Sequence, residues 1–238
     1  MKILNFLLAV VALVVAGAAF YQSTPKGVEK TLVNNPKMLL NASSAVEKLL
    51  QEEAVVKQEA AAKSAENAIK ENIDLFNNDA NTPFTGPKDA AVTVVEFFDF
   101  SCGYCHALAP TIEKLAEANA DVKFVFKPLA FLSPASEYAA AAFVAANAQG
   151  KAYDFYKRVM EIRGLNEEKI NEAAEKAGVD VEKMKKDMTS EEVQEVLRTT
   201  VDLAEKANIN GVPLLILNGK ILHTNRADEL QSAIDAAK

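Results

Sequence analysis

The chain holds two cysteines, and both lie in the motif Cys102-Gly103-Tyr104-Cys105. Such a pair can close a disulfide, Cys102–Cys105, or exchange it with another protein. An apolar run precedes the motif and a helical pattern follows it, an order typical of redox-active dithiols. Since unpaired N–H groups at a helix start stabilise a thiolate, Cys102 is predicted to be the exposed attacking thiol. Cys105, one turn later, is predicted to be shielded and to resolve the mixed disulfide.

Two other chemistries use the same residues. With His106 the motif becomes Cys-x-x-Cys-His, the attachment pattern of c-type haem. A haem also needs a second axial ligand, and only His223 or a methionine remains. A cysteine pair can also bind copper(I) or zinc as soft thiolates, although two ligands are few unless an oligomer supplies more. We favour thiol–disulfide exchange, with no metal or cofactor, and interpret His106 as a cationic or polar neighbour of the site.

The elements around the motif follow the order β-α-β, a helical insertion and β-β-α. Asn218-Gly219 is typical of a hairpin turn between the last two strands. The pattern predicts an α/β domain over residues 83–238 with an inserted helical subdomain at about 132–207. The other expected elements are strands at 92–100, 122–127, 214–217 and 220–223, and helices at 101–118 and 228–237.

The segment 96–105, which reads E-F-F-D-F-S-C-G-Y-C, resembles the active-site region of the DsbA family of exported thiol–disulfide oxidoreductases. The Cys-Gly-Tyr-Cys version and the N-terminal extension are similar to its ScsC branch. Gly211-Val212-Pro213 is similar to the family's loop whose cis-proline faces the cysteines. The resemblance covers about residues 83–238 and implies a thioredoxin-like fold. It also implies the catalytic residues, which are Cys102, Cys105, Glu96 and Pro213.

Glu96 lies in an apolar strand, where a carboxylate is costly unless it is partnered or protonated. Burial would raise its pKa, whereas a surface-facing position would not. The resemblance implies that Glu96 accepts the proton of Cys105 as that thiol attacks the mixed disulfide. Lys127 is a candidate charge partner for Glu96, although we favour a solvated lysine at the strand end.

Four residues next to the cysteines and the proline are expected to contact substrate: Val212, Gly103, Tyr104 and His106. The backbone of Val212 could pair with an extended substrate strand. Within the family, Val212 before the proline resembles oxidases, whereas Gly103-Tyr104 resembles isomerases. The direction of the reaction therefore stays open.

Residues 1–19 are expected to be a secretory signal peptide, because Met1-Lys2 precedes an apolar run that ends in small residues. The run is also long enough to be an uncleaved membrane anchor. Either role places the domain in an exported, periplasmic location where disulfides form. The expected partners are exported proteins with thiols or disulfides, and a membrane redox partner. The net charge of −7 argues against nucleic acid.

Residues 20–82 are expected to be a helical extension. Its first apolar stripe consists of Leu39, Leu40, Val46, Leu49, Leu50, Val55 and Val56, and its second of Ala62, Ala65, Ile69, Ile73 and Phe76. A stripe without a partner in its own segment favours a homo-oligomer through residues 36–76, and the family resemblance favours a trimer. A solvated tether is the alternative.

Overall fold

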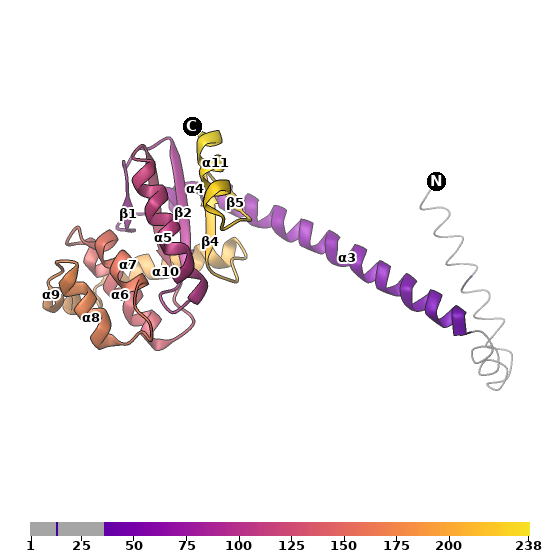
Figure 1. Ribbon diagram of the computed structural model, residues 1–238, viewed down its shortest axis with the longest axis horizontal. Helices are drawn as coiled ribbons and strands as arrows, with labels where there is room; N and C mark the ends of the chain where they lie inside the picture. The colour runs from indigo at the N-terminus through magenta and orange to yellow at the C-terminus, as the bar shows by residue number, and fades with distance from the viewer. Residues whose placement is uncertain (1–12, 14–35) are drawn as a thin grey trace. The chain divides into compact units, whose positions relative to one another are not determined.

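The computed structural model describes residue 13 and residues 36–238 (Figure 1). The signal peptide or anchor expected at 1–19 lies outside the described residues, apart from residue 13. Within the described part of the chain, no helix is both long and apolar enough to cross a membrane. The chain divides into two units, Met1–Ala60 and Ala61–Lys238, and the redox motif lies in the second.

A mixed five-stranded sheet with the strand order β1-β3-β2-β4-β5 organises the second unit. Strands β2 and β3 run parallel and are buried at every position, which explains their nearly continuous apolar sequence. The other neighbouring pairs are antiparallel. The strands are β1 (Phe84–Thr85), β2 (Val92–Phe98), β3 (Val122–Pro128), β4 (Leu214–Leu217) and β5 (Lys220–Leu222).

Two turns of the sheet depend on glycine. Gly219 has a φ of +83° after Asn218 at +46°, so the expected hairpin joins β4 to β5. Gly86 follows β1, a strand that is not among those expected from the sequence. Its φ is +86°, and a Cβ there would lie 2.1 Å from the carbonyl oxygen of Val122. Only glycine therefore allows the chain to pass so close to β3.

In Figure 1 the helices between β3 and β4 gather at one end of the sheet, and the last helix of the chain lies near the other end. Helix α5 (Gly103–Ala118) directly follows β2, and α11 (Ala227–Ala237) packs against α5. The insertion between β3 and β4 is helical, as the sequence indicated, and contains five helices. They are α6 (Pro134–Asn147), α7 (Ala152–Met160), α8 (Glu167–Lys176), α9 (Val181–Asp187) and α10 (Glu191–Lys206).

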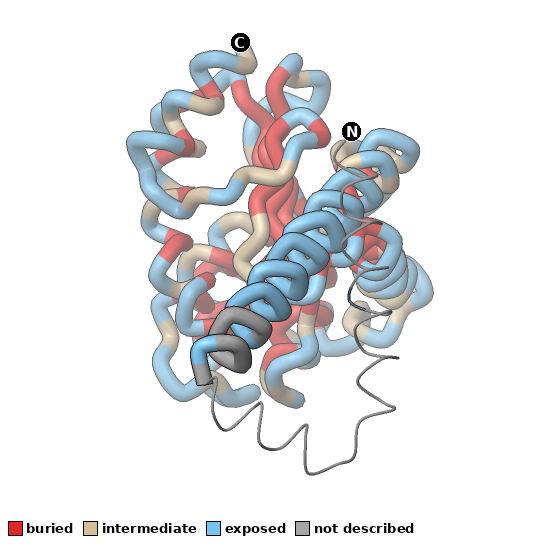
Figure 2. Tube along the Cα trace, turned by 90° about the vertical axis from the view of Figure 1, so that its right-hand side faces the viewer, coloured by how far each residue is buried: buried red, intermediate tan, exposed pale blue. Residues whose placement is uncertain are grey.

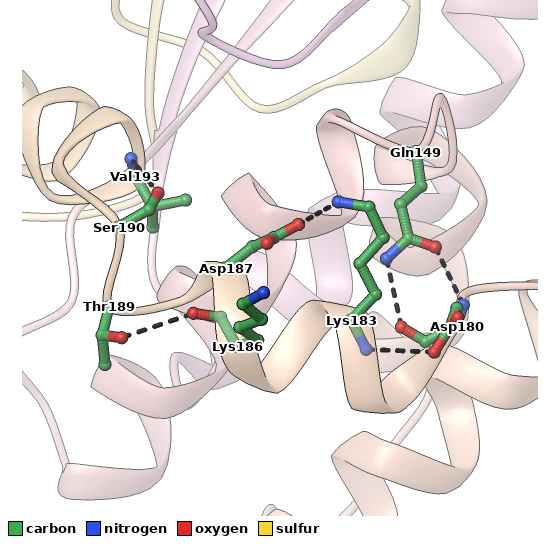
Figure 3. A network of polar contacts seen from close by, with 8 residues as sticks. All are labelled: Gln149, Asp180, Lys183, Lys186, Asp187, Thr189, Ser190 and Val193. Carbon is green, nitrogen blue, oxygen red and sulfur yellow. Dashed lines mark hydrogen bonds and ion pairs between the residues drawn. The ribbon is translucent and has the colours of Figure 1, made fainter.

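Side-chain caps fix the path of the insertion between its last three helices (Figure 3). Asp180 accepts a hydrogen bond from the backbone N–H of Lys183 at 3.0 Å and thereby starts α9. Ser190 does the same for α10 with Val193, at 3.3 Å. Gln149, just after α6, bonds the backbone of Asp180 in both directions, at 2.9 and 3.1 Å. These contacts hold α9 against the end of α6.

The N-terminal helices are α3 (Pro36–Glu71) and α4 (Ile73–Asn78). Residues 43–60 are exposed throughout, as the pale tube of Figure 2 shows. Further along, Ile69 and Phe76 are completely buried in a cluster with Phe97 and other residues on one face of the sheet. The compact unit therefore begins at Ala61, before the boundary at residue 83 that the sequence suggested.

Candidate active site

The two cysteines lie where β2 leads into α5. Cys102 is the N-cap of α5, and its Sγ accepts a hydrogen bond from the backbone N–H of Cys105 at 3.4 Å. A hydrogen bond from a helix N-terminus stabilises a thiolate at this position. Both thiols are free in this structure. Cys102 is 6% exposed, less than expected for an attacking thiol, whereas Cys105 is not exposed at all.

The loop before β4 brings Val212 and Pro213 to Cys102, although more than a hundred residues separate them in sequence. The peptide bond between Val212 and Pro213 is cis. The thiol of Cys102 donates to the carbonyl oxygen of Val212 at 3.5 Å. The backbone before the proline therefore flanks the first cysteine, as an edge for an extended substrate would.

The residues between the cysteines are open to solvent. Tyr104 is 78% exposed. A Cβ at Gly103 would meet nothing within 4 Å. A bound polypeptide could therefore contact both residues without rearrangement of α5.

Glu96 points into the core rather than to solvent. Its side chain is buried, and the hydroxyl of Tyr156 donates to Oε2 at 2.9 Å. The other carboxylate oxygen, Oε1, is buried without a protein partner among the described residues. Burial raises the pKa of Glu96 to about 8, and the hydrogen bond from Tyr156 opposes that rise. Near neutral pH this carboxyl group can both accept and release a proton.

Cys105 lies within electrostatic range of Glu96. Burial is the main cause that raises the pKa of the Cys105 thiol, and the charges of Cys102 and Glu96 raise it further. A thiol that resists ionisation needs a nearby base when it attacks. Glu96 is a titratable group whose charge acts on this thiol.

Lys127 is neither the partner of Glu96 nor a solvated residue. It is completely buried on the other face of the sheet, where its Nζ lies 3.5 Å from a carboxylate oxygen of Asp79 and 3.5 Å from Oγ1 of Thr82. Burial lowers the pKa of Lys127 to about 8, against the opposing effect of Asp79. The strand pairing places Glu96 opposite Phe126, one position away, which explains why the two charges face opposite sides.

His106 is fastened to the protein through both ring nitrogens. Nδ1 lies 2.6 Å from the carbonyl oxygen of Met160, and Nε2 lies 2.7 Å from that of Phe100. Carbonyl oxygens only accept, so a ring nitrogen that carries a proton donates to its carbonyl. His106 therefore holds α5 to α7 and to the end of β2. The structure does not leave its ring free for substrate or for a haem iron.

Sequence reasoning missed two residues that shape this site. Tyr156 lies in α7, sixty residues from Glu96. No spacing rule connects them, and an aromatic residue in a helical insertion is usually core. Asp99 is buried beside the motif, and its backbone carbonyl accepts from the N–H of Cys102 at 3.0 Å. The charge of Asp99 in an apolar run was a signal that the sequence offered.

The strand order and the position of the cysteine pair at the start of the helix after β2 are those of a thioredoxin-like fold. Residues 93–235 match the DSBA-like thioredoxin domain, and the chain belongs to this family. The predicted fold class and family resemblance are thus confirmed.

Solved structures of related proteins agree. A thioredoxin-like oxidoreductase from Silicibacter pomeroyi is 33% identical, with a TM-score of 0.65 over 69% of this chain and 96% of that chain. Proteus mirabilis ScsC in a transitional conformation is 26% identical, with a TM-score of 0.65 over 88% of this chain and 91% of that chain.

The chain matches most of the length of some curated relatives but only a small part of others. A probable disulfide bond formation protein D from Bacillus anthracis is 32% identical over 63% of this chain and 75% of its own length. The Na(+)/H(+) antiporter NhaA 1 of Salinispora arenicola is 27% identical over 64% of this chain, and the match spans about a quarter (24%) of the antiporter.

Proposed function

We propose that this protein is an exported thiol–disulfide oxidoreductase that forms or isomerises disulfides in other exported proteins through Cys102 and Cys105. The observation that carries the proposal is the position of Cys102. Its Sγ accepts from the start of α5 and lies beside the carbonyl of Val212. Membership of the DsbA-like family supports oxidoreductase chemistry.

In the oxidising direction, a substrate thiolate attacks Sγ of Cys102 in the Cys102–Cys105 disulfide. The bond between the two cysteines breaks, a mixed disulfide forms, and Cys105 leaves with the electron pair and takes a proton from Glu96. A second substrate thiolate then attacks the mixed disulfide and releases reduced Cys102. The substrate loses two electrons and the cysteine pair gains them.

In the reducing or isomerising direction, the Cys102 thiolate attacks a substrate disulfide. Cys105 then attacks Cys102 in the mixed disulfide and passes its proton to the Glu96 carboxylate. The released substrate thiolate can attack another of its own disulfides, which gives isomerisation. Val212, Gly103 and Tyr104 are proposed to contact the substrate, with Pro213 presenting Val212. The contacts of His106 argue for a positioning role instead.

Substitution of the cysteines tests their roles. Cys102→Ser should abolish exchange with a reduced or scrambled substrate, because the attacking sulfur is gone. Cys105→Ala should instead accumulate mixed disulfides, because the resolving thiol is missing. Mass spectrometry of non-reduced adducts measures both outcomes. Capture by Cys102→Ser but not by Cys105→Ala would reverse the assignment.

The contacts of His106 favour exchange over haem attachment. His106, the ligand that c-type haem would need, is engaged through both nitrogens. The copper or zinc alternative is tested by the metal content of the reduced protein, because an oligomer could supply further ligands.

We also propose a periplasmic location, a membrane partner that sets the redox state of the pair, and a homo-oligomer, with a trimer favoured. The exposed apolar side chains of α3, namely Val46, Leu49, Leu50, Val55 and Val56, support the oligomer. Since Ile69 and Phe76 are buried in their own unit, the proposed contact is confined to residues 36–60 rather than 36–76.

A further inference from the structure

The side chain of Asp99 is buried, and its carboxylate accepts four hydrogen bonds. Oδ1 accepts from the backbone N–H of Ser101 at 2.7 Å and from the hydroxyl of Ser136 at 2.6 Å. Oδ2 accepts from the backbone N–H groups of Phe131 and Leu132, both at 3.0 Å. A buried carboxylate with four donors is a strong, specific tie. It joins the residues that lead into Cys102 to the segment between β3 and α6.

A second contact fixes the same segment against the redox motif. The hydroxyl groups of Ser101 and Ser133 lie 2.7 Å apart. Ser133 is also the N-cap of α6, so the start of that helix is satisfied without Asp99. Oδ2 of Asp99 therefore binds the backbone N–H groups of Phe131 and Leu132, the two residues before this N-cap.

Those residues expose large apolar side chains beside the site. Phe131 is 53% exposed and Leu132 is 48% exposed. Tyr104, between the cysteines, is exposed as well. Apolar groups held rigidly at a reactive centre offer binding surface at a low entropic cost. On another side of Cys102, the carbonyl of Val212 offers a backbone acceptor, which suits a polypeptide rather than a small thiol.

We propose that Asp99 is a positioning residue for substrate recognition, which holds Phe131 and Leu132 where they bind apolar side chains flanking a cysteine in an extended polypeptide. This inference rests on the proposed thiol–disulfide exchange and names its substrate class. The loop backbone is fixed before the substrate arrives, so ordering it does not weaken binding.

The test compares two synthetic peptides, one with leucine and phenylalanine beside its cysteine and one with serine at both places. The wild-type chain should prefer the apolar peptide. Asp99→Asn puts an amide donor where a carboxylate accepted two N–H groups. The preference, as a ratio of kcat/KM values, should fall about tenfold, mainly through KM. Because both peptides meet the same Cys102, a change in thiol reactivity cancels in the ratio.

Three further variants complete the test. The pair Phe131→Ser and Leu132→Ser should lower the ratio as Asp99→Asn does, and adding Asp99→Asn should lower it little further. Asp121→Asn, the same change at an exposed aspartate paired with Lys238, should leave the ratio unchanged. Equal rates of the wild type with both peptides, or equal losses for both in Asp99→Asn, would overturn the proposal. Exchange with neither peptide would instead contradict the proposed function.

Discussion

At the scale of single residues, the proposed chemistry depends on Glu96, a carboxyl group whose pKa is raised by burial into the range where it can gain and lose a proton near neutral pH. The pKa of Glu96 rises from an ordinary value of 4.5 to about 8. Between these two pH values the folded chain holds a proton that the unfolded chain has lost. Stability should therefore fall as the pH rises from about 4.5 to about 8 and level off above it. The pKa of Lys127 is lowered from 10.5 to about 8, so the contribution of this residue to stability rises with pH, but only above about pH 8.

Glu96→Gln should remove this pH dependence, because glutamine is neutral and still accepts from Tyr156. Urea unfolding at pH 5 and pH 8 should show a gain at pH 8 on the order of a few kcal/mol relative to the wild type. Resolution of the mixed disulfide should slow by about a hundredfold, since Cys105 loses its base. Stopped-flow release of a labelled peptide measures that rate.

The matched control is Glu117→Gln, an exposed glutamate on α5. It should leave both the stability profile and the resolution rate at wild-type values. A wild-type resolution rate in Glu96→Gln would show that another group takes the proton of Cys105. A retained fall in stability between pH 5 and pH 8 would mean that Glu96 is not the titrating residue.

At the scale of elements, the end of the N-terminal extension is part of the catalytic unit. Ile69 and Phe76 are completely buried, and Phe76 lies 5.8 Å from Phe97 between ring centroids. A chain beginning at Ala61 keeps both contacts and should unfold at the same urea concentration as the full chain in a monomeric background. A chain beginning at Pro83 loses both and should be several kcal/mol less stable.

Point variants distinguish the stability that comes from the packing of Phe76 from any effect of shortening the chain. Phe76→Ala should cost about 3–5 kcal/mol in the free energy of unfolding, because it empties a buried site. Leu50→Ala, an apolar truncation at an exposed position of α3, should stay within about 0.5 kcal/mol of the wild type in a monomeric background. Equal stability of the two truncated chains would show that the end of α3 is not part of this core.

The sequence predicted the elements well because each left a local signal. The apolar run of β2, the hairpin at Asn218-Gly219 and the helical insertion all appear where they were expected. Helical periodicity identified the apolar stripe of Ile69 and Phe76 but not the surface that it packs against. Long-range contacts such as the Tyr156–Glu96 hydrogen bond leave no trace in local spacing, so only the structure identified them.

At the scale of the whole molecule, the open question is how many redox sites act together. Every described residue with a proposed role in exchange lies between Glu96 and Pro213. Residues 43–60 of α3 carry none of this chemistry and expose apolar side chains. Identical apolar stripes can bury one another in a parallel bundle, which would join several sites at high effective concentration. Such an arrangement favours isomerisation over simple oxidation.

We therefore expect light scattering to show an oligomer for the chain without its first 19 residues and a monomer for the chain beginning at Ala61. The shorter chain should lose isomerase activity on a scrambled substrate and keep or gain oxidase activity on a reduced one. Leu49→Glu with Leu50→Glu should also give a monomer, because charges cannot be buried in the stripe. Gln58→Glu, an exposed polar position on the same helix, should remain an oligomer. A monomeric longer chain at micromolar concentration would contradict the oligomer, and the expectation of isomerase activity would lose its basis.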